Sequence, residues 1–455
     1  MEKNNHSIRS SRLVLWMILL VALVVRVLIF IRFEPWDSTV ISRQILIFDQ
    51  LQYHEIARTL LQTCTFQSEF IPFRTPGYPV YVAFIYGLFG EQPYFVLFSH
   101  IGLNLLSIFL MYKIGKELFS GKVGLAAAFL FSLDAHHTMF IYYFLTESIY
   151  TTIFLLGLYT YIRGLKTNRL LFFLLTGFVY GLSMLIRPIS QYYIYGIFVF
   201  TLMWYYKDWK NGIKWAAVVI VAYFITIAPW SYRNYHTFGH YAVSNIKGYN
   251  FLFWNASYFE AKRQQKTIEE INASFIDTLK TRGWRPDSNP FEKERIDGEL
   301  AKEILTANFP DYLKMHLIGT VKIHLSVGTQ SLTDVLHIPA KKWTEEEKYT
   351  NGVIPLIQKF FATKTIYEIL LGSFVAVFLG IVYFFAAIGI WRMIREKQIL
   401  LMLFLLGSAG YFALASGIIS YARYRLPSMP FYILLACFGM AFLWDKYQKK
   451  KLSAK

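Results

Sequence analysis

Apolar segments of about 17 to 24 residues recur along the chain and alternate with polar segments. A helix needs about 20 mostly apolar residues to cross a lipid bilayer, so each segment predicts one transmembrane helix. The predicted spans cover residues 13–32, 94–112, 123–141, 145–162, 170–186, 190–206, 213–230, 368–391, 398–416 and 426–444. An even number of spans places both termini on the same side of the membrane.

Two intervals between the spans, residues 33–93 and 231–367, are much longer than the others. Helical periodicity in the first interval predicts helices near residues 50–62 and 76–89, with Pro76 in the first turn of the second helix. That second helix is apolar but short, which favours an orientation along the membrane surface. The second interval is richer in charged residues and predicts a small cap with helices at 259–281, 292–308 and 310–326.

The expected fold class is therefore all-α: a polytopic membrane protein with about ten transmembrane helices and two large extracytoplasmic segments. The predicted organisation is a cytoplasmic N-terminus (1–12), a transmembrane core that includes the first outer loop (13–230, with the loop at 33–93), an extracytoplasmic cap (231–367), C-terminal transmembrane helices (368–444) and a basic cytoplasmic tail (445–455).

Composition and charge agree with this architecture. The 455 residues are 55% hydrophobic and only 16% charged, whereas about a quarter of the residues in a soluble domain are charged. A net charge of +17 is also typical of nucleic-acid-binding proteins, but here most Lys and Arg residues lie in one alternate set of short segments between the spans. The opposite short loops hold only Arg187, Arg423 and Arg425. By the positive-inside rule the basic set and both termini are cytoplasmic, and nucleic acid is not an expected partner.

The N-terminal run and the cysteines do not change this interpretation. The run is too long for a signal peptide and lacks a small-residue cleavage site, so we expect a retained first span. Cys64 and Cys437 are far apart in the sequence, which argues against a disulfide framework. The abundance of Lys, Ile, Phe and Tyr favours an AT-rich bacterium, and the plasma membrane is then the expected location.

An acidic residue follows the first span on its outer side. Asp49 precedes the predicted helix 50–62, so it either caps that helix or deprotonates a substrate hydroxyl just outside the bilayer. Asp37 is the competing acid in the same loop. Tyr53 and His54 lie one helical turn beyond Asp49, where they either position a sugar or phosphate or lie in the membrane interface.

Ionisable residues also interrupt the outer ends of several spans. Arg187, Arg423 and Arg425 depart from the charge asymmetry, which favours binding of a phosphate at headgroup level over snorkelling to lipid. Glu147 begins an apolar span, where an acid needs a partner or a role, and pairing with one of these arginines is the simpler explanation.

Polar residues close the seventh span. Arg233 and Asn234 follow the interface-type residue Trp230 and provide groups for binding a sugar. His316 and His324 are eight residues apart, a helical spacing, but a metal site there is not favoured, and no metal or other cofactor is expected.

Several of these stretches together resemble a known family. They are Asp49-x-x-x-Tyr53-His54-x-x-Ala57, Arg74-x-Pro76-Gly77-Tyr78-Pro79 with Phe89-Gly90, Thr146-Glu147, Arg187-Pro188, Pro229-Trp230-x-x-Arg233-Asn234 with Phe238-Gly239, and Arg423-x-Arg425-x-Pro427. The set resembles the membrane glycosyltransferases of the GT-C class, above all the dolichyl-phosphate-mannose–protein mannosyltransferases and the bacterial aminoarabinose transferases of lipid A. The resemblance runs in order from residue 13 to residue 444.

This resemblance implies a glycosyltransferase of GT-C-like fold, with a polyprenyl-phosphate-linked sugar as donor on the outer side of the membrane. The family's catalytic acid falls on Asp49, but Gln50 stands where many members carry a second acid. Substrate binding is expected of the remaining candidates, which are Tyr53, His54, Arg74, Glu147, Arg187, Arg233, Asn234, Arg423 and Arg425.

The mechanism expected is a single displacement with inversion, in which Asp49 activates the acceptor and the arginines stabilise the departing phosphate. The transferred group is a hexosyl or pentosyl unit, and the acceptor is a lipid, glycan or protein hydroxyl or amine. Two other classes remain alternatives: a transporter or lipid-linked-glycan flippase, and a non-catalytic scaffold whose outer loop binds a partner. Convergence of Asp49 with the outer arginines at one site distinguishes the transferase from both.

Overall fold

The computed structural model describes residues 2–340, 358, 362–418 and 421–453, and these residues form helices and connecting loops with no β-strand. Parts of two expected segments, residues 341–357 and 359–361 of the cap interval and residues 454–455 of the tail, lie outside the described residues. The helices of the apolar core are α1 (Glu2–Phe33), α5 (Pro93–Leu118), α6 (Gly121–Leu133), α7 (Ala135–Met139), α8 (Glu147–Thr167), α9 (Leu170–Ile186), α10 (Tyr193–Trp204), α11 (Trp209–Phe238), α20 (Ile366–Arg395), α21 (Ile399–Ser416) and α22 (Met429–Ser453).

The all-helical, multi-pass architecture is confirmed, but the expected number of spans is not. In the part of the chain that the structure describes, six helices are long and apolar enough to cross a membrane, and a seventh span results if α6 and the α7 segment, bent by 61°, count together. Helix α9 is apolar but shorter, and α10 has only 12 residues. Hydrophobic periodicity located these helices in the sequence, but it does not report how far each one extends across a bilayer.

The core helices approach one another closely where small residues face each other. At the contact of α20 with α22, a Cβ added to Gly389 would collide with the backbone of Leu435, and one added to Gly439 would collide with Phe385. Close backbone approach of this kind is a common source of packing energy between helices in membranes, where water does not drive association.

A buried arginine joins three segments of the core. Arg26, in α1, donates to the Asn104 Oδ1 atom of α5 at 2.8 Å, to the Ser132 carbonyl of α6 at 3.0 Å and to the Thr138 hydroxyl of α7 at 3.0 Å. A charge at membrane depth needs such partners, so Arg26 fixes the position of α1 against the core.

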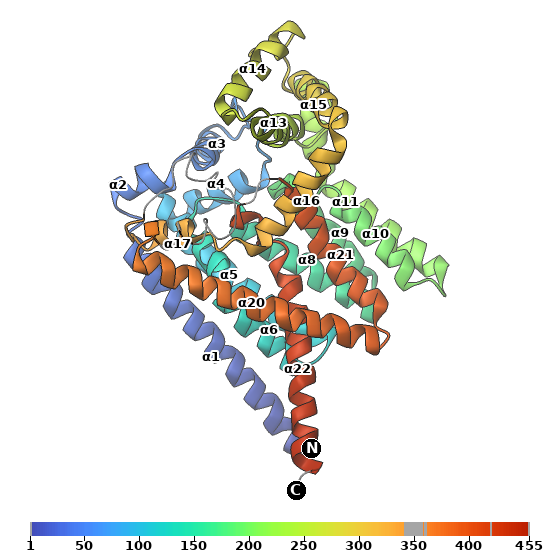
Figure 1. Cartoon of the computed structure of the whole chain (residues 1–455). Coiled ribbons are helices and arrows are strands. Elements are labelled where there is room, and N and C mark those ends of the chain that lie inside the picture. Colours follow the sequence, from blue (N-terminus) through green and yellow to red (C-terminus); the bar gives the residue numbers. More distant parts are fainter. Residues whose placement is uncertain (1, 341–357, 359–361, 419–420, 454–455) are drawn as a thin grey trace.

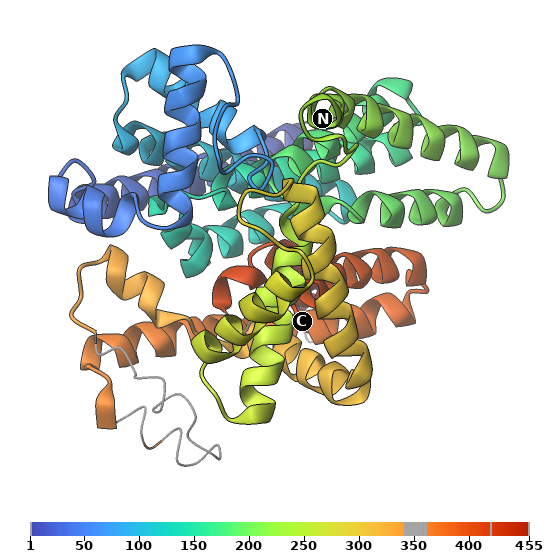
Figure 2. The same ribbon diagram turned by 90° about the horizontal axis from the view of Figure 1, so that it is seen from above.

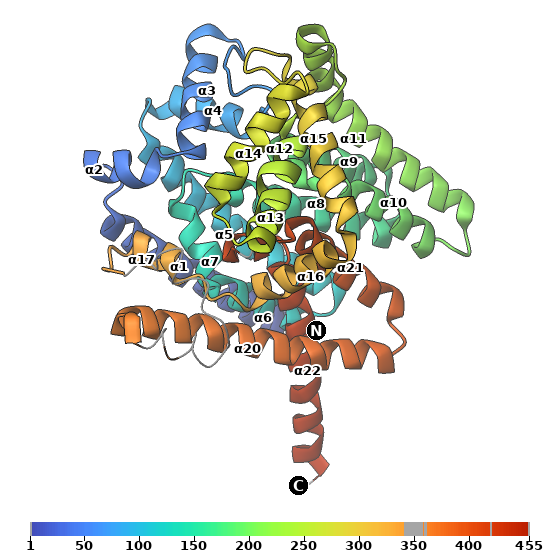
Figure 3. The same cartoon turned by 45° about the horizontal axis from the view of Figure 1, so that its top comes forward.

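The two long intervals gather at one end of the molecule (Figure 1). The first contains α2 (Ser38–Val40), α3 (Asp49–Thr63) and α4 (Gly77–Phe89), and the second contains α12 (Ile246–Tyr249), α13 (Ser257–Gln264), α14 (Ile268–Thr281), α15 (Pro290–Ala307), α16 (Phe309–Leu325) and α17 (Thr329–Val335). The first turn of α1 and the last turn of α22 lie at the opposite end (Figure 1). The views in Figures 2 and 3 show α13, α14 and α15 lying above the helical core beside α3.

The cap has an apolar core of its own, built from residues that include Leu252, Phe259, Phe275 and Leu300. The helix expected at 259–281 is two helices in the structure. Gln265 adopts a left-handed conformation (φ 55°), and Thr267 begins α14 with a capping box that includes Glu270. These local signals, which end one helix and begin another, override the continuous apolar periodicity.

Candidate functional site

Asp49 lies in the first turn of α3 and does not cap this helix. The preceding Phe48 occupies the N-cap position with φ 45°, and no side chain caps the helix. Instead, the Asp49 carboxylate pairs with the guanidinium of Arg74, whose Nε atom donates to the Gln52 Oε1 atom at 2.8 Å. The Asp49 side chain is 43% exposed and that of Arg74 is 9% exposed, so a buried cation holds an accessible carboxylate. This arrangement suits a proton acceptor that meets substrate at the surface.

The competing acid has a structural role. Asp37 caps α2 by accepting hydrogen bonds from the Thr39 and Val40 backbone amides at 2.7 and 3.2 Å. These two bonds hold the pKa of Asp37 below its ordinary value, because they favour the ionised carboxylate. The N-cap explanation considered for Asp49 therefore applies to Asp37.

Glu147 joins two of the outer arginines. Its Oε1 atom accepts a hydrogen bond from Arg187 at 2.8 Å and also pairs with the Nε atom of Arg423. Glu147 is only 2% exposed, whereas the side chains of Arg187 and Arg423 retain 15% and 26% exposure. One carboxylate thus neutralises one of two neighbouring cations, and a net positive charge remains for an anionic group.

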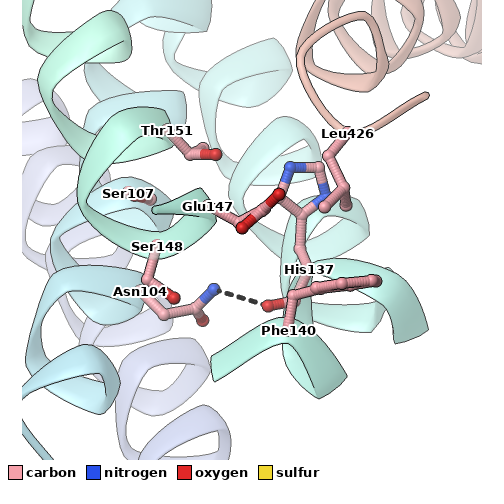
Figure 4. Close-up of a pocket in the computed structure, with 8 residues that line it drawn as sticks. All are labelled: Asn104, Ser107, His137, Phe140, Glu147, Ser148, Thr151 and Leu426. Atoms are coloured by element: carbon pink, nitrogen blue, oxygen red, sulfur yellow. Dashed lines mark hydrogen bonds between the residues drawn. The ribbon is translucent and has the colours of Figure 1, made fainter. Parts of the chain in front are cut away.

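The inner side of Glu147 lines a cavity of about 10 Å³ together with Asn104, His137 and Thr151 (Figure 4). This volume is about that of one water molecule. A sugar or phosphate does not fit there, so any substrate must contact the arginines from their exposed side.

Tyr53 lies within electrostatic range of both ionic groups. Its phenol is buried, with the guanidinium of Arg74 5.3 Å from the ring centre. Burial raises the pKa of Tyr53, and the charges of Arg74, Asp49, Arg187 and Arg423 all act on it. Burial acts to lower the pKa of Arg423, but the combined influence of Glu147, Tyr424 and Asp49 raises this pKa above its ordinary value. Asp49 and the Arg187–Glu147–Arg423 group therefore lie within electrostatic reach of each other around Tyr53.

Arg425 has different partners from Arg423. It is 2% exposed, and its Nη1 atom donates to the carbonyls of Ile323, His324 and Ser326 at 3.0, 3.2 and 2.7 Å. Its Nη2 atom lies 3.3 Å from the His136 Nδ1 atom. Arg425 thus holds the end of α16 against the core, and the structure does not bring it to the Arg187–Glu147–Arg423 group.

Arg233 and Asn234 also bind the protein's own backbone. Arg233 donates to the Phe66 carbonyl at 3.1 Å, and the Asn234 amide donates to the Ala242 carbonyl at 2.7 Å. Together they attach the end of α11 to the first outer segment and to the start of the cap. Both were expected to bind a sugar, and this role stays a prediction beside the backbone contacts that the structure shows.

His54 faces α4. Its Nδ1 atom lies 2.7 Å from the Tyr86 hydroxyl, and burial lowers the pKa of His54, which favours the neutral imidazole at pH 7. Gln52 was not among the expected site residues, although it orients Arg74. A glutamine on a half-polar helix carries no sequence signal that separates it from its neighbours.

The fold and the site together define a multi-pass helical membrane protein with an exposed carboxylate and two linked arginines at one end of its helical core. The described residues hold no group of three or more His, Cys, Asp or Glu side chains suited to a metal ion. Residues 73–232 match the sequence model of the dolichyl-phosphate-mannose-protein mannosyltransferase family. The expected resemblance to GT-C membrane glycosyltransferases is thereby confirmed over this part of the chain. A comparison with curated proteins gave no match.

Solved structures of two kinds are also similar. The oligosaccharyltransferase AglB from Archaeoglobus fulgidus, in complex with an inhibitory peptide and a dolichol-phosphate, aligns with a TM-score of 0.48 and 16% identity over 95% of this chain and 51% of its own. ArnT from Cupriavidus metallidurans bound to undecaprenyl phosphate aligns with a TM-score of 0.41 and 14% identity over 93% of this chain and 77% of its own. The chain spans about half the length of the archaeal enzyme. Both TM-scores lie below 0.5, so neither alignment is used to assign a role to any residue of this chain.

Proposed function

We propose that this protein transfers a hexosyl or pentosyl group from a polyprenyl-phosphate-linked donor to an acceptor hydroxyl or amine. The observation that carries the proposal is the gathering of the accessible Asp49 carboxylate and the Arg187–Glu147–Arg423 group around Tyr53. The name of the matched family, which refers to dolichyl-phosphate-mannose, supports a lipid-phosphate sugar as donor. A transporter or a scaffold has no need for an acid and two cations at one exposed edge.

The chemistry follows from the charges. Asp49 accepts the proton of the acceptor hydroxyl while that oxygen forms a bond to the anomeric carbon. The bond from the anomeric carbon to the phosphate oxygen breaks at the same time, so the configuration inverts. Negative charge grows on the departing polyprenyl phosphate, and Arg187 and Arg423 stabilise it.

The orientation proposed places the site on the outer side of a bacterial plasma membrane and both termini in the cytoplasm. Basic residues mark the opposite end of the core, where Glu117 of α5 pairs with Arg163 and Lys166 of α8. Under the positive-inside rule this end faces the cytoplasm.

The test is release of free polyprenyl phosphate by purified protein supplied with a series of polyprenyl-phosphate sugars together with glycan, lipid and peptide acceptors. Wild type releases lipid phosphate from at least one donor, and Asp49→Asn loses about 100-fold or more, the usual contribution of a general base. Asp37→Asn is the matched control, because asparagine caps a helix as well as aspartate does and turnover stays at the wild-type level. Equal turnover by Asp49→Asn and Asp37→Asn refutes the base assignment, and no release from any combination of donor and acceptor favours a transporter.

A further inference from the structure

A cavity of about 530 Å³ lies between the first outer segment and the cap. One wall consists of Gln52 and residues 69–73, and the other of residues from α12, α14, α15 and the loops that join them. Its volume is in the range of small-molecule binding sites.

This cavity adjoins the Asp49 site. Gln52 lines it and accepts the hydrogen bond from Arg74, which in turn pairs with Asp49. On the cap side, the ring of Tyr249 meets that of Phe73 edge-on at 5.3 Å, and the charges of both Asp49 and Asp297 act on the Tyr249 hydroxyl. A molecule in the cavity is therefore placed to present a group to Asp49.

Three residues that line the cavity carry buried polar atoms without hydrogen-bond partners among the described residues. They are the Oδ1 atoms of Asn245 and Asp297 and the indole Nε1 atom of Trp284. Asp297 is only 6% exposed, although it lies on the helix α15 that packs the cap core. Buried polar groups in folded proteins are nearly always paired, so two acceptors and one donor at one cavity indicate a ligand that offers both kinds of group.

The charges of the lining exclude an anionic ligand. Glu69, Glu294 and Asp297 line the cavity, against the single cation Lys293. Burial raises the pKa of Asp297 to about 7, with Lys293 opposing and Glu294 adding to the shift. At neutral pH this carboxyl therefore both donates and accepts hydrogen bonds, which suits hydroxyl groups.

Aromatic rings supply the remaining surface. Tyr249, Phe253 and Trp284 line the cavity on the cap side, and Phe70 and Phe73 line it on the other. Flat apolar faces beside hydrogen-bonding groups match the alternation of C–H faces and hydroxyl edges on a sugar ring.

We propose that this cavity is the acceptor site and that it binds a neutral carbohydrate, whose hydroxyl is delivered to Asp49. The assignment of a glycan as the acceptor rests on the proposed transferase function. A hydroxyl donates and accepts at one atom, so a sugar satisfies the indole N–H of Trp284 together with the oxygens of Asn245 and Asp297.

The test measures binding of fluorescently labelled neutral tetrasaccharides of glucose, mannose, galactose or N-acetylglucosamine to the full-length protein in detergent. We expect wild type to bind at least one of them, and Asp297→Leu and Trp284→Phe each to weaken that binding about tenfold, the equivalent of one hydrogen bond. Asp297→Leu should leave folding intact, because it replaces a buried polar group that has no hydrogen-bond partner for its Oδ1 atom. The matched control is Glu299→Leu, on the exposed side of the same helix. A phosphorylated tetrasaccharide binds more weakly than the neutral one.

The possible results distinguish an error in the assignment of the cavity from an error in the proposed reaction. No tetrasaccharide binding by wild type refutes the inference, as does equal binding by Asp297→Leu and Glu299→Leu or tighter binding of a serine-containing peptide. Release of polyprenyl phosphate is measured in the same preparations with the tetrasaccharides, a lipid or a peptide supplied as acceptor. Donor turnover without sugar binding refutes the acceptor site alone, whereas sugar binding without turnover of any donor refutes the transferase and leaves the cavity as a carbohydrate site.

Discussion

Substitution of Glu147 by Gln tests whether the arginine group is built for a phosphate. In the native protein one carboxylate faces two guanidinium groups, so one positive charge is unbalanced. Glu147→Gln keeps the shape and leaves both cations without a counter-charge. Breaking a buried ion pair from one side costs about 3–5 kcal/mol, so the variant unfolds at a temperature several degrees lower.

Glu147→Gln lowers the stability of the free protein, but it should strengthen the binding of a phosphate ligand. The variant offers two uncompensated cations where the native protein offers one, and a hydrogen bond between charged groups contributes about 1.5–3 kcal/mol. Polyprenyl phosphate should therefore bind Glu147→Gln roughly ten times more tightly or better, and should restore much of the lost thermal stability.

The assay is thermal unfolding in detergent over a titration of polyprenyl phosphate. Glu368→Gln is the control, since Glu368 is equally buried, at 1% exposure, and pairs with one cation, Lys364. That variant should lose stability without gaining affinity for the lipid phosphate. If Glu147→Gln binds polyprenyl phosphate no better than wild type, the arginines serve only to neutralise Glu147 and the phosphate assignment is wrong.

Three other substitutions test separate parts of the structure. Gln52→Ala should lower kcat about 3- to 10-fold with little change in donor KM, since Arg74 loses one of its two partners, and Gln52→Glu, which keeps the acceptor, should restore most of it. Arg425→Lys should lower the free energy of unfolding by about 1–3 kcal/mol, because the hydrogen bonds of the guanidinium to backbone carbonyls are lost, while donor KM stays unchanged. A rise in donor KM would instead indicate that Arg425 contacts the donor phosphate. The raised pKa of Asp297 means that the folded state holds its proton more tightly than the unfolded state between about pH 4 and pH 7, so stability falls as pH rises through this window. Asp297→Asn cannot titrate, so its free energy of unfolding relative to that of wild type should rise by about 1–2 kcal/mol between pH 5 and pH 8, with solvent screening allowed for. Thermal unfolding at a series of pH values measures this difference, and parallel pH profiles of the two proteins would contradict the prediction.

Hydrophobic periodicity predicted most of the helical core, because a membrane helix is specified by a local property of the chain. The predicted helix at 50–62 corresponds to α3, and the one at 76–89 corresponds to α4. Periodicity failed where a local signal outweighed it, as at Gln265, and it carries no information on how a helix such as α10 lies relative to a bilayer.

The site was predictable only in part. Glu147 pairs with two of the arginines that stood out by their position, as the simpler explanation for this acid expected. Arg425 lies two residues from Arg423 and was indistinguishable from it by charge and location, yet its guanidinium binds backbone carbonyls. The two guanidinium groups lie in one short turn, Ala422–Arg425, and that of Arg425 is directed to the end of α16, a contact between segments that are distant in sequence.

Buried charged residues give a more general indication of function, because some have partners within the protein and others do not. Arg26 interrupts an apolar span and Glu147 begins one, and the structure gives both strong internal partners. Asp297 lies on α15, a helix rich in charged residues, and the structure buries it beside Ile296, Leu300 and Ala301 with no partner for its Oδ1 atom among the described residues. The apolar surroundings of Arg26 and Glu147 are visible in the sequence, whereas the burial of Asp297 is visible only in the structure, which also shows whose burial is offset by internal partners. The one that is not offset borders the 530 Å³ cavity, which is why Asp297, and not Arg26, points to a ligand.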